Sequence, residues 1–393
     1  MQQDPIVIVG MARTPMGGFM GDLSAVKTTE LGATAVRAAV ARSGVSADEI
    51  DALIMGCVLP AALGQAPARQ AALGANLNLT TDCTTINKVC GSGMKSVMLA
   101  HDSLVAGSQT VVVAGGMENM SGAPHMLPKA RSGYRFGHGE LLDHMAFDGL
   151  EDAYEGQAMG VYAEQCAERY SFTREQQDEY ALRSLARAQA AMENGSFDAE
   201  LTPVVIKTRK GEVTVSQDEQ PPKARPDKIP VLPAAFKKGG TVTAANASSI
   251  SDGAAALVLM RQSECEKRGL KPLAKIIGQT SHGQTPAEFT IAPVSAIKKL
   301  LEQVSWSVDD VDLFEINEAF AVVTMAAIKE LDLNSDKVNV NGGACALGHP
   351  IGASGARILI TLIAALQNQQ KKQGVAALCI GGGEAVAMAV EVF

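Results

Sequence analysis

The sequence predicts an α/β fold built from two related halves. The order glycine-serine-glycine, helix, strand, glycine-glycine occurs over residues 91–116, and it returns over residues 353–383 with alanine in place of the first glycine. Short apolar runs that suit buried strands alternate with segments of helical periodicity in both parts. Four features repeated in one order indicate a duplicated unit rather than a chance match of one short motif.

The first half begins with the apolar run Ile6–Val9, which predicts a buried strand. A helix follows and is expected to stop at Ser43-Gly44, because glycine commonly ends helices. A second strand, a second helix and a third strand that leads into Gly115-Gly116 complete this half. The expected ranges are Glu30–Arg42 and Met94–Ala106 for the helices, and Ala52–Gly56 and Thr110–Ala114 for the strands.

The second half repeats this plan, and a segment of different texture separates the two. Residues from about 119 to 249 are rich in Tyr and Pro. They include a charged helix over Thr173–Met192 and a Pro- and Lys-rich stretch over Pro221–Pro233. Insertions on a rigid scaffold often bind substrate, so we expect this one to contribute to a binding site. The second-half ranges are Asp312–Glu315 and Val375–Ile380 for strands, and Ala319–Leu331 and Ala356–Gln367 for helices.

Composition excludes several classes of protein. The 393 residues are 47% hydrophobic, which allows a large core, and the net charge of −8 argues against a dedicated nucleic-acid binder. No segment approaches the roughly 20 apolar residues of a membrane span, and no signal peptide is recognised. We therefore expect a cytoplasmic protein. Its seven cysteines show neither metal nor disulfide spacing, so they are expected to be free thiols.

Cys90 is the first candidate for chemistry. It directly precedes Gly91 and the predicted helix, and the positive end of a helix dipole favours a thiolate. The neighbouring glycines leave space for a ligand, and the Cys90 N–H could stabilise an oxyanion. The alternative is a structural cysteine in a tight turn.

His349, Cys379 and Asn317 are the other candidates. His349 lies between Gly348 and Pro350, where the backbone is restricted, and a neutral imidazole there would accept the Cys90 proton. Cys379 ends a strand, and the three glycines after it let backbone N–H groups face a ligand; a buried strand cysteine is the alternative. Asn317 either caps a helix or orients a water or a substrate carbonyl. Two thiols and a base together favour carbon–carbon chemistry on thioesters over hydrolysis.

These residues stand in segments that resemble the thiolase family, of the acetyl-CoA acetyltransferase type. The resemblance covers essentially the whole chain. Its most specific matches are Asn87-Lys88-Val89-Cys90-Gly91-Ser92-Gly93, Asn317-Glu318-Ala319-Phe320, Asn341-Gly342-Gly343 through Gly348-His349-Pro350-Ile351-Gly352-Ala353-Ser354-Gly355, and Cys379-Ile380-Gly381-Gly382-Gly383.

The resemblance implies a thiolase-like fold of two duplicated βαβαβαββ halves in a five-layer αβαβα core, with an inserted loop domain. We accordingly divide the chain into residues 1–270, which include the loop domain at about 119–249, and residues 271–393. The family's usual assembly implies a homodimer or homotetramer.

The implied activity is that of an acetyl-CoA C-acetyltransferase, the reversible Claisen condensation of two acetyl-CoA to acetoacetyl-CoA and CoA through an acyl-cysteine. Cys90 would carry the acyl group, His349 would activate Cys90, and Cys379 would remove the α-proton. His349 and a water held by Asn317 would form one oxyanion hole, and the N–H groups of Cys90 and Gly381 the other.

Coenzyme A and acetyl-CoA are implied as substrates, with no permanently bound cofactor and no metal. Ser248, Leu150, Met159, Phe236 and Ala319 are expected to line the CoA site, and Lys223 or Arg225 to meet its phosphates. The sequence departs from the short-chain pattern at Ala158, where such enzymes often have histidine. Phe289 stands where some bacterial members have methionine.

Three alternatives remain open from the sequence. A broader 3-ketoacyl-CoA thiolase of fatty-acid β-oxidation would use the same residues. A ketoacyl synthase that acts on a carrier protein would rely on histidine where this chain has Cys379. A non-catalytic lipid carrier or scaffold with the same fold predicts loss of Cys90 or His349, and both are present.

Overall fold

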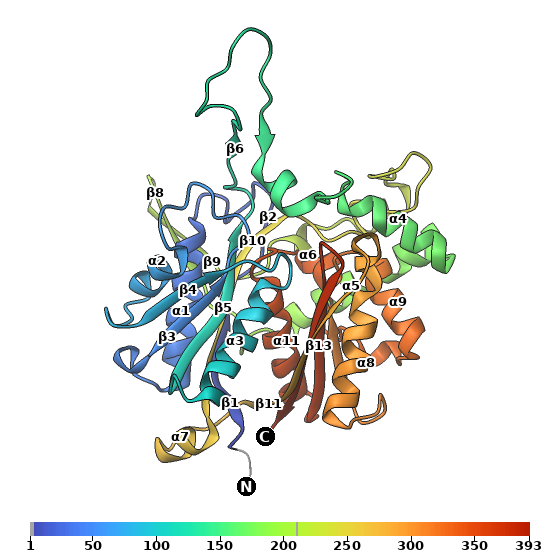
Figure 1. Ribbon diagram of the computed structural model, residues 1–393. Helices are drawn as coiled ribbons and strands as arrows, with labels where there is room; N and C mark the ends of the chain where they lie inside the picture. The colour runs from blue at the N-terminus through green and yellow to red at the C-terminus, as the bar shows by residue number, and fades with distance from the viewer. Residues whose placement is uncertain (1–3, 210) are drawn as a thin grey trace.

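Five layers of helices and strands form the core. The computed structural model describes residues 4–209 and 211–393. Figure 1 shows the layers in sequence across the molecule, with strands of each half on either side of a central helical layer. The predicted αβαβα order is therefore confirmed. The three helical layers are α1 (Thr28–Ser43) with α2 (Pro67–Gly74), α3 (Ser92–Ala106) with α11 (Ser354–Asn368), and α8 (Ala292–Val304) with α9 (Ala321–Leu331).

The strands of the first half follow the order β4-β3-β5-β10-β1. The three strands β4, β3 and β5 are parallel, whereas β10 runs antiparallel to both β5 and β1. The remaining bounds in this half are β1 (Ile6–Arg13), β2 (Gly17–Gly18), η1 (Ala47–Glu49), β3 (Ala52–Gly56), β4 (Asp82–Ile86), β5 (Val111–Asn119), β10 (Ser251–Arg261) and α7 (Gln262–Lys267).

The second half repeats this topology as β12-β13-β14-β11. Strands β12 and β13 are parallel, and β14 is antiparallel to both β13 and β11. A single parallel bridge between Phe314 and Val338 takes the place that β4 holds in the first half. The remaining bounds are β11 (Ala274–Gly283), η4 (Pro286–Ile291), β12 (Leu313–Ile316), η5 (Ser335–Lys337), α10 (Ala344–Leu347), β13 (Gln373–Ile380) and β14 (Glu384–Val392).

In both halves, an aspartate carboxylate accepts two backbone N–H groups at the start of a central parallel strand. The Asp51 carboxylate accepts the N–H groups of Thr110 and Val111 at 2.7 and 2.9 Å. The Asp312 carboxylate accepts those of Lys372 and Gln373, both at 2.9 Å. Two carboxylates with the same task at matching strand starts support the duplication.

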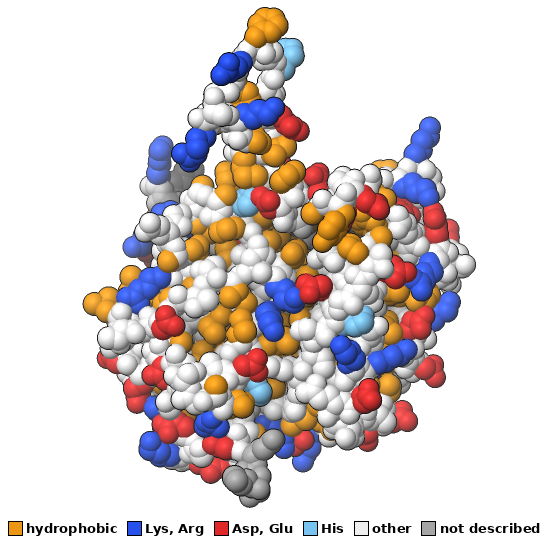
Figure 2. All heavy atoms as spheres, in the orientation of Figure 1, with side chains coloured by type: hydrophobic (Ala, Val, Ile, Leu, Met, Phe, Trp, Pro, Cys, Tyr) orange, Lys and Arg blue, Asp and Glu red, His pale blue; other side chains and the backbone are white. Residues whose placement is uncertain are grey.

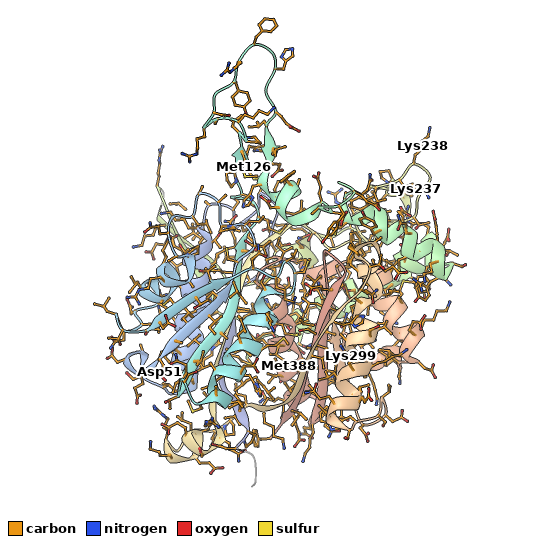
Figure 3. All side chains as sticks on the ribbon, viewed as in Figure 1. Asp51, Met126, Lys237, Lys238, Lys299 and Met388 are labelled. Carbon is orange, nitrogen blue, oxygen red and sulfur yellow. The ribbon has the colours of Figure 1, made fainter. Side chains whose placement is uncertain are left out.

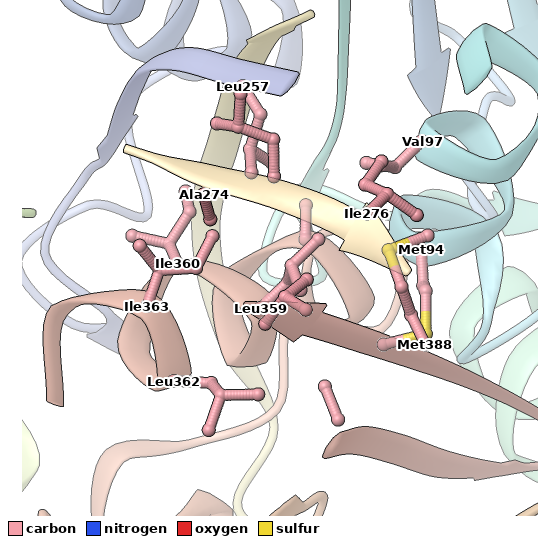
Figure 4. Close-up of a cluster of buried hydrophobic side chains, with 14 of the residues drawn as sticks. Met94, Val97, Leu257, Ala274, Ile276, Leu359, Ile360, Leu362, Ile363 and Met388 are labelled. Atoms are coloured by element: carbon pink, nitrogen blue, oxygen red, sulfur yellow. The ribbon is translucent and has the colours of Figure 1, made fainter. Parts of the chain in front are cut away.

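The two halves share one continuous sheet and one central core. Strand β1 pairs with β11 through Val7–Lys275 and Ile8–Ala274. Alternation along β1 directs Ile6 and Ile8 into the central core, whereas Val7 and Val9 pack on the outer side. Figure 4 shows the central core, where α3 and α11 meet both sets of strands; its labelled side chains include Met94, Val97, Leu359 and Met388.

The inserted segment contains its own helices and two short hairpins. The hairpin β6–β7 projects from the top of the molecule in Figure 1. The bounds are β6 (His125–Met126), β7 (Leu142–Asp143), a π-helical turn η2 (Ala146–Leu150), α4 (Met159–Tyr170), α5 (Arg174–Glu193), β8 (Val204–Thr208), β9 (Gly211–Val215), α6 (Gln220–Lys223) and η3 (Pro226–Val231).

Two expected boundaries are wrong for tertiary reasons. Gly115-Gly116 lie inside β5 rather than after it, because β10 pairs with β5 as far as Asn119. Ala319 is not helical, since its carbonyl accepts the N–H of Ser248 at 2.9 Å and α9 begins only at Ala321. The other predicted strands and helices are present, with ends that differ by a few residues.

Candidate active site

Cys90 is held in a strained turn between β4 and α3. Val89 has a φ of 45°, which is an uncommon left-handed conformation for a β-branched residue. The Ser92 hydroxyl accepts the Lys88 N–H at 2.8 Å and donates to the Val89 carbonyl at 2.7 Å, so it closes the turn. The structure therefore places Cys90 directly before the start of α3, as predicted, with only Gly91 between them.

The turn that carries His349 is clamped by glycines from the first half. A Cβ atom on Gly116 would lie 1.9 Å from the Gly352 carbonyl oxygen, and one on Gly56 or Gly93 would lie 2.8 or 3.0 Å from it. Contacts this short exclude any side chain at Gly116 and Gly56. The N-terminal ends of α3 and α11 also touch, because a Cβ on Gly93 would lie 2.8 Å from the Ala356 nitrogen. Cys90 and His349 therefore precede helices that meet at their N-terminal ends.

The hydrogen bonds of His349 define which nitrogen is free. The Ser354 hydroxyl donates to the Pro350 carbonyl at 3.0 Å and lies 2.5 Å from His349 Nδ1. When this hydroxyl donates to the Pro350 carbonyl, it accepts from Nδ1–H, and the lone pair of the imidazole then lies on Nε2. Nε2 is buried and has no hydrogen-bond partner among the described residues. Burial, with a contribution from Arg357, lowers the pKa of His349 to about 3, so the imidazole is neutral.

The Cys90 sulfur is a neutral thiol rather than the expected thiolate. Burial raises the pKa of Cys90 to about 11, although backbone hydrogen bonds from Gly381 and from Cys90 itself oppose this rise. The removal of the sulfur from water outweighs its position at the helix N-terminus. The N–H groups of Gly381 and Cys90 are also the two groups implied for one oxyanion hole. Both point at the Cys90 sulfur.

Cys379 lies beside Cys90 at the end of β13. It is fully buried, and burial together with the proximity of Cys90 raises its pKa well above the usual value. Gly382 and Gly383 follow with φ of 92° and 88°, which favour glycine. The triple glycine thus turns the chain sharply after Gly381, whose amide faces the Cys90 sulfur.

Asn317 follows the neighbouring strand β12. Its backbone N–H donates to the Ala377 carbonyl at 3.0 Å, which fixes it against β13 two residues from Cys379. The alternative that it caps a helix is wrong, because Phe320 is the cap of α9. Asn317 is buried, and within the described residues neither polar atom of its side chain has a partner. Such an amide suits the binding of a polar group of a ligand or of a water.

The five residues expected to line the CoA site lie in two groups. Met159 and Ala319 pack in one cluster with Cys379. The ring of Phe236 lies edge-on to that of Phe320 in this cluster, with 6.0 Å between the ring centroids. The Ser248 N–H donates a hydrogen bond to the Ala319 carbonyl. Leu150 packs with Cys90 against a second cluster, made of Val58, Leu59, Met120, Met145 and Ile351.

Two residues of the site were not predicted from the sequence. Ser354 orients His349, whereas the sequence around it predicts only the start of a helix. Glu118 is buried and accepts bonds from two loops of the site. Burial raises the pKa of Glu118 to about 7, against the effect of those bonds. No local pattern marks either role, since both depend on residues brought together by folding.

Two further predictions concern metals and membranes. Across residues 4–209 and 211–393, no three His, Cys, Asp or Glu side chains are grouped so that they could hold a metal ion. None of the helices in these ranges combines the length and the apolar content that a membrane crossing requires.

The fold and the site define a two-half α/β protein with a partly buried thiol, a neutral histidine and a second, fully buried thiol at the junction of the halves. Family models described as "Thiolase, N-terminal domain" and "Thiolase, C-terminal domain" match residues 6–263 and 270–392. The chain belongs to the thiolase family.

Individual relatives agree over nearly the full length. The chain is 51% identical over 387 residues to an acetyl-CoA acetyltransferase of Escherichia coli, with 98% of each chain covered. The crystal structure of the acetyl-CoA acetyltransferase of Bacillus anthracis is 44% identical, with a TM-score of 0.97 and 99% of each chain covered. A thiolase of Ascaris suum in complex with coenzyme A is 42% identical, with a TM-score of 0.94, and the match covers 99% of this chain and 100% of that one.

Proposed function

We propose that this protein is an acetyl-CoA acetyltransferase that condenses two acetyl-CoA to acetoacetyl-CoA and CoA, and catalyses the reverse thiolysis. The observation that carries the proposal is the buried, unpartnered Nε2 of His349 in a site with two neutral thiols, Cys90 and Cys379, within the described residues. The names of the relatives support acetyl transfer, and they give no support to the β-oxidation alternative.

In the first half-reaction, the Cys90 sulfur attacks the acetyl carbonyl of the first acetyl-CoA. His349 Nε2 takes the thiol proton, and the departing CoA thiolate takes the proton of Cys379. The products are an acetyl thioester on Cys90, an imidazolium on His349 and a thiolate on Cys379. The N–H groups of Cys90 and Gly381 would stabilise the oxyanion of this step.

In the second half-reaction, the Cys379 thiolate removes the α-proton of the second acetyl-CoA. The enolate carbon attacks the acetyl carbonyl, Cys90 leaves as a thiolate and regains its proton from His349, and the site returns to its starting state. The buried imidazolium and a water on Asn317 would stabilise the enolate oxygen. Each proton is returned within this cycle, so the chain's own residues account for every transfer.

The CoA site is proposed along Ser248, Leu150, Met159, Phe236 and Ala319. Of the two candidates for the phosphates, Arg225 is the better. Lys223 is engaged by Glu219 at 2.6 Å and by Asp22 at 3.5 Å. Arg225 forms no ion pair within the described parts of the chain. Phe289 shares the cluster that contains Cys379 and Met159, so an aromatic ring limits the space for long acyl chains.

We also propose that the protein is cytoplasmic and forms a homodimer or homotetramer. The boundary between the two halves of the chain is proposed to lie between residues 270 and 271. The β6–β7 hairpin supports association, because Leu127, Phe136 and Leu141 on it are all largely exposed. Figure 2 shows hydrophobic side chains along this projection and at its base.

The test is thiolysis kinetics of 3-ketoacyl-CoA substrates of increasing length, combined with intact-protein mass spectrometry after incubation with acetyl-CoA. We expect a strong preference for the four-carbon substrate and an added acetyl group on Cys90. Comparable kcat/KM values at about ten or more carbons would instead favour the β-oxidation type, and absence of acetylation would exclude the mechanism.

A further inference from the structure

Glu118 is a buried carboxylate whose hydrogen bonds join two loops of the site. It lies near the end of β5 and is fully shielded from solvent. One oxygen, Oε1, accepts the Leu59 N–H at 3.1 Å and lies 3.7 Å from the Cys57 sulfur. The other, Oε2, accepts the N–H groups of Val58 and Gly352, both at 2.9 Å. Both oxygens therefore act as hydrogen-bond acceptors.

The two loops joined in this way both contribute to the surroundings of the reacting sulfur. Val58, Leu59 and Ile351 belong to the cluster against which Cys90 and Leu150 pack. Gly352 ends the turn that begins at His349, and α11 follows that turn. A Cβ on Gly352 would lie 2.5 Å from Glu118 Oε2, so the carboxylate and the turn are in direct contact.

We propose that Glu118 is a positioning residue for the reaction at Cys90: it holds the His349–Gly352 turn of the second half against the 57–59 loop of the first half, and so fixes His349 Nε2 relative to the Cys90 sulfur. This inference rests on the function proposed above. Glu118 bonds to neither reacting group in this arrangement, and its effect passes through backbone N–H groups of the two loops.

The distance between Cys90 and His349 is set across the junction of the two halves. Cys90 and His349 belong to different halves, and misplacement of reacting groups by about 1 Å costs up to about 100-fold in rate. The glycine clamp around Gly352 sets how closely the turn approaches but carries no directional bond of its own. Glu118 accepts directional hydrogen bonds both from this turn and from the 57–59 loop, which packs beside Cys90.

The test compares Glu118→Gln with the wild-type protein and with Asp51→Asn. Glutamine has an NH₂ group in place of one carboxylate oxygen. This donor would face backbone N–H groups, which are also donors, so the hydrogen bonds to one of the two loops would be lost. We expect kcat for acetoacetyl-CoA thiolysis to fall by about 10- to 100-fold with KM for CoA within about twofold, and iodoacetamide modification of Cys90 to change in rate. Asp51 also bonds two N–H groups at β5, but at its opposite end, where Figure 3 labels it. Its variant should keep wild-type kcat.

Each outcome decides the inference. A kcat and a Cys90 modification rate within twofold of wild type in Glu118→Gln would overturn it, as would an equal loss of kcat in Asp51→Asn. If Glu118→Gln does not fold, Glu118→Asp replaces it: a lower kcat at unchanged KM supports the inference, and wild-type kcat overturns it. A wild-type protein without thiolase activity would count against the proposed function instead, and the Cys90 modification rates would still report on Glu118.

Discussion

The turns that precede α3 and α11 occupy matching places in the two halves, yet their serines do different work. Ser92 closes a backbone turn, with bonds to Lys88 and Val89. Ser354 bonds back to Pro350 in a similar way, but its oxygen also lies 2.5 Å from the His349 imidazole. The serine of one helix start therefore only closes the backbone beside Cys90, whereas that of the other also contacts and orients the His349 imidazole.

The ends of β5 and β13 show the same divergence. Counted from the strand starts that Asp51 and Asp312 anchor, Glu118 in β5 and Ile380 in β13 hold the same position. Each reaches the turn of the opposite half: Glu118 accepts the Gly352 N–H, whereas the Ile380 side chain lies against Gly91. The duplication gives the two halves the same backbone framework. The candidate site lies where side chains at equivalent positions of that framework differ.

The largest expected effect comes from removal of the first-half thiol. Cys90→Ala should lower kcat by at least about 10⁴-fold and abolish acetylation, because the acyl carrier is lost. Intact-protein mass spectrometry after incubation with acetyl-CoA measures this directly. Cys83→Ala, which removes another partly buried thiol on the preceding strand, is the control and should be acetylated normally. Acetylation of the Cys90 variant at wild-type level would assign the nucleophile elsewhere.

Removal of the second-half thiol should separate the two half-reactions. Cys379→Ser should lower condensation by about 10²- to 10⁴-fold, since serine is a poor proton carrier at neutral pH. Acetylation of Cys90 should still occur, because a CoA thiolate can leave without the proton that Cys379 supplies, and the same mass shift measures it. Cys265→Ser places the same change at another buried cysteine, far along the chain in α7, and should leave condensation unchanged. Equal loss of acetylation and condensation would contradict the assigned role.

The two matching serines offer a paired test of intermediate size. Ser354→Ala removes the acceptor for Nδ1–H of His349, so the imidazole loses its fixed tautomer, and we expect about a 10- to 100-fold loss of kcat. Ser92→Ala removes bonds that only close a turn and should mainly reduce stability, by about 1 kcal/mol. Steady-state kinetics and thermal melts on both variants measure the contrast. Similar kcat losses in the two would show that the turns are functionally alike.

The smallest effect is expected where the halves remain equivalent. Asp51→Asn and Asp312→Asn each weaken two bonds to backbone N–H groups, and each should cost about 0.5–1.5 kcal/mol per bond lost. Urea unfolding curves should give similar losses for both, with kcat within twofold of wild type. A loss of activity in one variant alone would show that the anchors have diverged as well.

Local pattern was enough to predict the order of the elements. Ala52–Gly56 is a strand with the predicted bounds, and the helix before Gly44 ends where glycine adopts a left-handed conformation. These features depend on neighbours in the chain, so the sequence carries them directly.

The sequence by itself determined the duplicated α/β plan and the inserted segment, and it indicated the candidate reactive side chains. Only the tertiary structure decided that Cys90 is a neutral thiol, that Ser354 contacts Nδ1 of His349, and that Glu118 joins the two halves. The physical reason is that pKa values, tautomers and clamped turns depend on burial and on partners far apart in the chain. The helix dipole at Cys90 could be read from the sequence, but the burial that outweighs it could not.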